Sequence, residues 1–170
     1  MAVGAILGVT MVYLLALLIG VIAGLRAMTA PAAIAWAAYL GWLDLSGSWL
    51  SFLGTIWAAG LFSLLAIAEL VTDQLPSTPS RKVPQQFAAR LVMGALSGAA
   101  IGLPHGLWIG GLVAGVIGAV IGTYGGAELR AKLAASFGKD PPAAYIEDAI
   151  ALIGASMIIA SLAPTMAAAV

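Results

Sequence analysis

Residues 68–90 read AELVTDQLPSTPSRKVPQQFAAR and separate two long apolar halves of the chain. The segment holds five of the fourteen formal charges of the protein, namely Glu69, Asp73, Arg81, Lys82 and Arg90. It also holds Pro76, Pro79 and Pro84, and prolines this close together interrupt a helix. We therefore predict a polar turn that joins two apolar helices and turns the second half of the chain back along the first.

The composition indicates an integral membrane protein. Of the 170 residues, 62% are hydrophobic and 8% are charged, and the mean hydropathy is +1.08. Soluble domains carry about 25% charged residues, whereas a helix that crosses the roughly 30 Å bilayer core needs about 20 apolar residues. We predict an all-α, polytopic helical membrane protein whose residues 1–170 form a single transmembrane domain in contact with the lipid bilayer.

Several functional classes lack support. The net charge is zero, so nothing indicates binding to nucleic acid. Cysteine is absent, which excludes disulfides and thiolate metal sites, and the only histidine, His105, lies in a predicted turn. The apolar run 3–25 follows no basic residue and is longer than the core of a signal peptide, so we expect it to be retained. Without a catalytic or metal-ligand pattern, we expect no enzyme activity, metal or cofactor.

Long, predominantly apolar runs predict about five transmembrane helices, at residues 3–25, 50–68, 85–103, 107–124 and 143–163. Between the first two, residues 31–41 form a run of about 18 Å at 1.5 Å per residue, which is too short to cross comfortably. We expect a re-entrant or interfacial half-helix there, with Thr29 as its cap and Pro31 in its first turn. Asp140 and the two prolines after it predict the start of the last helix, with the carboxylate as its cap and proline in its first turn.

The two halves of the chain share a weak similarity. In the first half, Arg26 is followed by a short helix and then a span. In the second half, Arg130 is followed by a shorter helix and then a span. Units 1–72 and 107–163, joined by the span 85–103, would then form an inverted repeat, as in many transporters. A general similarity among helices rich in small residues explains the match equally well.

The basic residues predict the orientation. With five spans, six of the seven lie on one side, which marks the cytoplasm of a bacterial inner membrane: Arg81, Lys82, Arg90, Arg130, Lys132 and Lys139. Loops 74–84 and 126–142 are then cytoplasmic. If 31–41 crosses completely, there are six spans, Arg26 joins the same side and the N-terminus moves outside. Both arrangements place Trp42, Trp49 and Trp108 at the opposite interface.

Arg90 is the most informative charged residue. Only 13 residues, or about 20 Å of helix, separate it from the Pro104 turn, so it lies within the hydrocarbon. A lone arginine there costs about 2.5 to 3.5 kcal/mol at mid-depth, so we predict carboxylate partners. Glu69 and Asp73 share a helical face, and Asp148 or Glu147 faces them from the last span. Three interpretations remain open: Glu69 lies at the headgroups, the cluster is a structural clamp, or it binds a proton or ion.

Arg26, Thr29 and Pro31 form a second candidate site. The start of a helix has free N–H groups and partial positive charge, so with Arg26 beside it this one could hold an anion. The simpler interpretation, which we favour here, is that Arg26 anchors the chain to lipid headgroups.

Glycines recur every three or four residues along the predicted fourth span, at Gly111, Gly115, Gly118, Gly122 and Gly126. Such spacing lets another helix approach closely, either within one subunit or across an interface between subunits. We expect a homo-oligomer, most simply a dimer, that forms through this helix.

A short motif resembles a known family. The residues that carry the resemblance are Gly24, Leu25, Arg26 and Pro31, then Glu69, Asp73 and Pro76, and then Arg90, Gly94, Ala95 and Leu96. The family is that of small bacterial membrane proteins known as domain of unknown function 4126. The resemblance covers residues 5–103 best and implies a multi-pass inner-membrane protein. It brings no activity or substrate with it.

Two functional hypotheses follow. The first is a transporter or channel-like module for a small molecule or ion, because ionisable residues inside a membrane commonly mark ion paths. The second is a scaffold or accessory subunit of a membrane complex, in which the charges only join helices. An enzyme that acts on lipids would need a nucleophile and a base, and we find no such pair.

Overall fold

The computed structural model describes residues 2–73 and 83–163, and their fold is all-helical, as predicted. Four helices are long and apolar enough to cross a membrane, over Ile6–Leu25, Pro84–His105, Trp108–Phe137 and Pro141–Leu162. The α-helices are α1 (Ala2–Leu25), α2 (Thr29–Tyr39), α3 (Ile56–Thr72), α4 (Pro84–Gly102), α5 (Trp108–Phe137) and α6 (Pro141–Leu162), with short 3-10 turns at Ser51–Gly54 and Leu103–His105. The sequence therefore identified the class of fold and its main elements.

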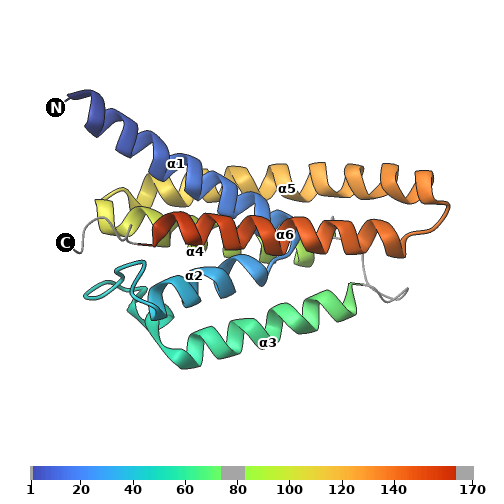
Figure 1. Cartoon of the computed structure of the whole chain (residues 1–170), viewed down its shortest axis with the longest axis horizontal. Helices are drawn as coiled ribbons and strands as arrows, with labels where there is room; N and C mark the ends of the chain where they lie inside the picture. The colour runs from blue at the N-terminus through green and yellow to red at the C-terminus, as the bar shows by residue number, and fades with distance from the viewer. Residues whose placement is uncertain (1, 74–82, 164–170) are drawn as a thin grey trace.

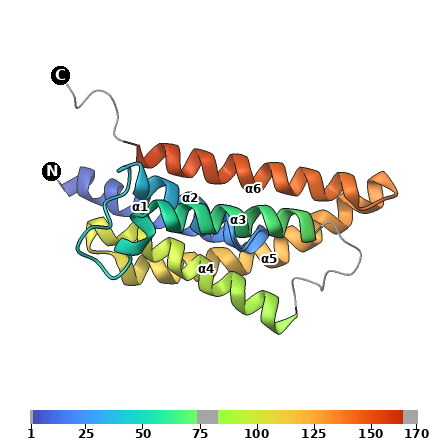
Figure 2. The ribbon, with the colours of Figure 1, turned by 90° about the horizontal axis from the view of Figure 1, so that it is seen from below.

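The helices lie side by side and alternate in direction (Figures 1 and 2). The start of α1, the connection from α2 to α3 and the end of α6 lie at one end of the molecule, and the α5–α6 connection lies at the other. Helix α1 stops part-way along α5 and α6, and α2 returns to the end where α1 began (Figure 1). The two helices thus form a hairpin whose tip, residues 26–28, lies inside the molecule.

The lengths of two helices differ from the prediction. Helix α3 begins at Ile56, because residues 51–54 form a 3-10 turn, and it is only 17 residues long. Helix α5 continues to Phe137, so the predicted polar loop 126–142 is wrong and only residues 138–140 connect α5 to α6. Residues 126–137 include four alanines and two leucines together with Glu128, Arg130 and Lys132, all of which are strong helix formers. The helix ends at Gly138, whose φ of +68° suits a left-handed C-terminal cap.

The extension of α5 also bears on the predicted repeat. Unit 1–72 breaks at residues 26–28, whereas the matching part of unit 107–163 is continuous through Arg130. The repeat stays a prediction. The second short helix, on which the match partly rested, does not form, because α5 is continuous there. In the other predicted loop, residues 74–82 lie outside the described part of the chain.

The glycines of α5 pack inside the subunit. Gly111 and Gly115 lie against α4, and Gly118 and Gly122 lie against α1. A Cβ added at Gly122 would come within 3.0 Å of the Gly24 Cα, so the helices approach at backbone distance. Gly126 is also buried. Because this glycine face is already covered, a dimer would need another surface.

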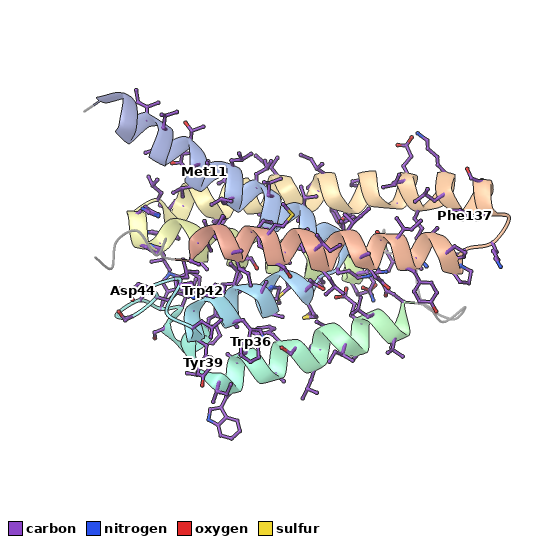
Figure 3. The ribbon with its side chains drawn as sticks, viewed as in Figure 1. Met11, Trp36, Tyr39, Trp42, Asp44 and Phe137 are labelled. Atoms are coloured by element: carbon purple, nitrogen blue, oxygen red, sulfur yellow. The ribbon has the colours of Figure 1, made fainter. Side chains whose placement is uncertain are left out.

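Trp49 and Trp108 meet edge to face with their ring centroids 6.4 Å apart, which confirms that these two predicted interfacial residues share one end. Figure 3 shows Trp42 and Asp44 at this end and Phe137 at the opposite one. Trp42, Trp49 and Trp108 therefore lie at one end of the bundle, and the last turns of α5 lie at the other.

Candidate functional site

Arg26 lies immediately after α1 and is completely buried. Its Nε donates a hydrogen bond of 2.6 Å to Asp148 Oδ1, and its Nη1 donates to Asp73 Oδ2. Its Nη2 lies 3.7 Å from Glu147 Oε2. Three carboxylates from α6 and the end of α3 thus surround one guanidinium. The interpretation of Arg26 as a headgroup anchor is wrong, because α1 ends inside the bundle rather than at its surface.

Arg90 on α4 is also buried, with 1% of its surface exposed, as the length argument predicted. Its Nη1 donates to the carbonyls of Gly24 at 2.9 Å and Leu25 at 2.7 Å. Carbonyls in the last turn of a helix lack partners within that helix, so Arg90 caps the C-terminal end of α1. Its Nη2 lies 3.7 Å from Glu69 Oε1 and 3.8 Å from Asp73 Oδ2, which confirms the predicted partners on α3.

Glu69 holds the turn between α1 and α2. Its Oε1 accepts from the Ala27 N–H at 2.7 Å and its Oε2 from the Met28 N–H at 2.8 Å. The start of α2 is therefore an anion-binding site of the predicted kind, but the anion is a carboxylate of the protein. This placement makes the headgroup interpretation of Glu69 wrong.

Thr29 does not cap α2 as expected. The N-cap is Met28, and the Thr29 hydroxyl makes no hydrogen bond with any described residue. Glu69 satisfies the N–H groups before it, so the hydroxyl is not needed there. Pro31 lies in the first turn of α2, where its missing N–H costs nothing.

The sequence analysis did not place Arg130 in any site. Its Nη2 and Nε donate to Asp140 at 2.6 and 3.0 Å, and its Nη1 lies 3.5 Å from Glu147 Oε2. Its Nη2 also reaches the backbone carbonyl of Asp73 at 3.3 Å. Asp140 is the N-cap residue of α6 and two prolines follow it, as predicted, but its side chain makes no cap hydrogen bond to the helix. The predicted loop hid Arg130, because only a continuous α5 brings its side chain beside α6.

We call Arg26, Arg90, Glu69, Asp73, Glu147 and Asp148 the charged cluster. The cluster is larger than predicted, because Asp148 and Glu147, which were expected near Arg90, contact Arg26. Asp73 Oδ2 contacts both arginines, so it links the end of α1 to α4. The resulting network joins α1, α3, α4 and α6, with Arg130 adding α5.

One small cavity adjoins the charged cluster within the described part of the chain. A cavity of about 30 Å³ lies beside Arg130, Glu147 and Leu25, which is room for about one water molecule. Among the described residues, no three or more histidine, aspartate and glutamate side chains are arranged to hold a metal ion. The chemistry available at the cluster is therefore that of carboxylates and guanidinium groups, with protons as the smallest exchangeable species.

No known protein family, curated protein or solved structure matches the chain. The resemblance to the family of small bacterial membrane proteins stays a prediction. Any function proposed for the chain therefore rests on its own geometry, above all on the charged cluster.

Proposed function

We propose that the protein is a small transporter or channel-like membrane module in which the charged cluster takes up a proton or a cation. The observation that supports this most strongly is the convergence of Asp73, Glu147 and Asp148 on the single guanidinium of Arg26. Carboxylates that share a site repel one another, and one added proton or cation relieves that repulsion. Arginine stays charged at all relevant pH values, so an added proton must go to a carboxylate.

The position of the cluster supports a coupling role. It lies at the tip of the hairpin formed by α1 and α2, and interrupted helices of this kind commonly carry substrate and ion sites in transporters. Because Asp73 contacts both Arg26 and Arg90, neutralising it weakens the hold of α3 on the hairpin and on α4 together. Protonation of one carboxylate would in this way change the packing of three helices.

We further propose that the end with Arg130, Lys132 and Lys139 faces the cytoplasm of a bacterial inner membrane. Basic residues accumulate on the cytoplasmic side of membrane proteins. Helix α2 returns to the end where α1 begins, so the turn between the two helices lies on the side toward which α5 runs, as in the six-pass alternative (Figure 1). The start of α1 then faces the outside.

Flux through reconstituted vesicles tests the transport proposal. We expect proton or monovalent-cation flux above that of protein-free vesicles, and a loss of at least tenfold in Asp73→Asn. Glu128→Gln is the matched control, because the Glu128 side chain is 69% exposed and pairs with Lys132 on the surface of α5. Equal flux in all three proteins, or flux in none, contradicts the proposal.

One observation favours a second function, that of a scaffold or accessory subunit. Both guanidinium groups are buried and the adjacent cavity holds about one water molecule, as in a purely structural clamp. The scaffold hypothesis predicts that Arg90→Met together with Glu69→Gln restores the stability that either single change removes, in a protein that never supports flux. The transport proposal is favoured instead if the wild type supports flux and the double variant is stable but supports none.

A further inference from the structure

A groove of about 330 Å³ lies between α2, α3 and α6. Helix α2 packs against both of the other helices, and α3 lies at the edge of the bundle with α2 between it and α6 (Figure 1). On α2 the groove runs from Thr29 to Trp36, which is about 10 Å at 1.5 Å per residue. Ile67 and Leu152 in its walls are 58% and 45% exposed, so it opens to the surface that faces lipid.

The walls of the groove are apolar and carry no charged side chain. The polar groups among them are neutral: Thr29, Ser63, Ser156 and the indole of Trp36. Figure 3 shows Trp36 between α2 and α3, where its Nε1 donates to Ser63 Oγ at 2.9 Å. Ser156 donates to the Leu152 carbonyl at 2.8 Å. Three of these polar groups are therefore already hydrogen-bonded.

Thr29 is the exception. It is 4% exposed, and its hydroxyl has no hydrogen-bond partner among the described residues. A buried hydroxyl without a partner costs about 1 to 3 kcal/mol, and in a membrane no bulk water compensates for it. A partner that arrives from the bilayer through the groove would remove this cost.

We propose that the groove binds a neutral amphiphile from the bilayer, with a long apolar chain and a single hydroxyl or carbonyl head group that hydrogen-bonds to Thr29. The volume lies at the lower end of the range of small-molecule sites, and such sites combine apolar walls with a few polar groups. The neutral walls select against a charged head group, because a charge there would lack a partner. The inference goes beyond the proposed proton or cation site and does not depend on it.

Fluorescence quenching of Trp36 tests the proposal. The protein is placed in phosphatidylcholine nanodiscs after Trp42, Trp49, Trp57 and Trp108 are replaced by phenylalanine. The probes are a long-chain alcohol, an alkane and an alkylammonium, each with one bromine as quencher, and they are compared at equal mole fraction in the bilayer. We expect saturable quenching by the alcohol, with an affinity about fivefold higher than that of the alkane or the ammonium, which corresponds to one hydrogen bond.

Variants separate recognition by Thr29 from loss of structure. Thr29→Val should lower the affinity for the alcohol to that for the alkane, and Thr29→Ser should retain the preference. Ser97→Ala is the matched control, because Ser97 is a buried hydroxyl on α4 that also lacks a described partner but lies outside the groove. Non-saturable quenching by all probes, equal affinity for alcohol and alkane, tightest binding of the ammonium, or an unchanged Thr29→Val overturns the proposal.

Discussion

The turn that begins with Arg26 and the turn that comes after Arg130 differ in how deeply they are buried. The turn at residues 26–28 lies inside the bundle, and its Arg26 is completely buried. The turn at 138–140 is exposed, and the side chain of Arg130 is 16% exposed. The position of proline explains the difference. Pro31 stands five residues after Arg26, whereas Pro141 stands eleven residues after Arg130.

Proline lacks the N–H that a continuing helix needs and clashes with the preceding turn. Helix α1 therefore stops near Arg26, and its free backbone groups must be satisfied within the bundle. Helix α5 continues past Arg130, and its end lies outside, where water satisfies the free carbonyls. Similar sequence patterns thus give a completely buried arginine in one half of the chain and a partly exposed one, at the edge of the charged cluster, in the other.

The largest expected effect is that of Arg26→Met. The change leaves Asp73, Glu147 and Asp148 without the guanidinium on which they converge, and removing one member of a buried ion pair costs about 3 to 5 kcal/mol. Unfolding in detergent, followed by circular dichroism, measures it. A loss below about 1 kcal/mol would show that Arg26 is not the centre of the cluster.

Glu69→Gln comes next. It tests the two hydrogen bonds by which a carboxylate holds the backbone of the buried turn at residues 26–28. Hydrogen bonds to a charged group contribute about 1.5 to 3 kcal/mol, and Glu69 accepts two from the backbone of the buried turn. We expect destabilisation of about that size, together with faster hydrogen exchange at the amides of Ala27 and Met28. Unchanged exchange at both amides contradicts the assigned role.

Gly122→Ala tests the packing that keeps α1 beside α5. An added Cβ would meet the backbone of Val21 and Gly24, and overpacking costs about 1 to 3 kcal/mol. Gly125→Ala is the control, because nothing lies within 4 Å of its added Cβ, and alanine there should stabilise the helix slightly. Both midpoints come from the same thermal unfolding assay. Equal effects of the two changes contradict the close approach of α1.

Arg130→Met probes the less buried arginine in the comparison. Arg130 is 16% exposed and pairs with Asp140, which is 55% exposed, as well as with the buried Glu147, so we expect a smaller loss than for Arg26→Met. The loss should shrink in high salt, whereas the effect of Arg26→Met should persist because its partners are shielded from solvent. Equal losses of stability in Arg26→Met and Arg130→Met at high salt would contradict the claim that the two arginines differ in burial.

The smallest effect concerns Asp44 in the exposed connection from α2 to α3. Hydrogen bonds from the Ser46 side chain and backbone lower the pKa of Asp44 below its ordinary value of 3.8. A lowered pKa means that the carboxylate contributes stability above the unfolded pKa and loses it as the pH falls through the folded pKa. An NMR titration should show the shift, and Ser46→Ala should raise the pKa toward the ordinary value. A pKa unchanged by Ser46→Ala contradicts this cause.

The burial of Arg90 could be predicted from the sequence, because the number of residues between it and the Pro104 turn gives a helix shorter than the bilayer core. The sequence also predicted Glu69 and Asp73 as partners, since they share a helical face. The burial of Arg26 was missed, because α1 is long enough to cross and its end was expected at the surface. The role of Arg130 was missed for the opposite reason: a polar stretch suggested a loop, although its residues are good helix formers.

The proton content of the charged cluster tests the central claim most directly. Infrared spectroscopy of the protein in vesicles distinguishes protonated from ionised carboxyl groups by their carbonyl stretching bands. We predict that the folded protein shows a protonated-carboxyl band that is lost or shifted in Asp73→Asn and Asp148→Asn and persists in Glu128→Gln. A wild-type spectrum without such a band at any pH where the protein is folded would contradict the claim.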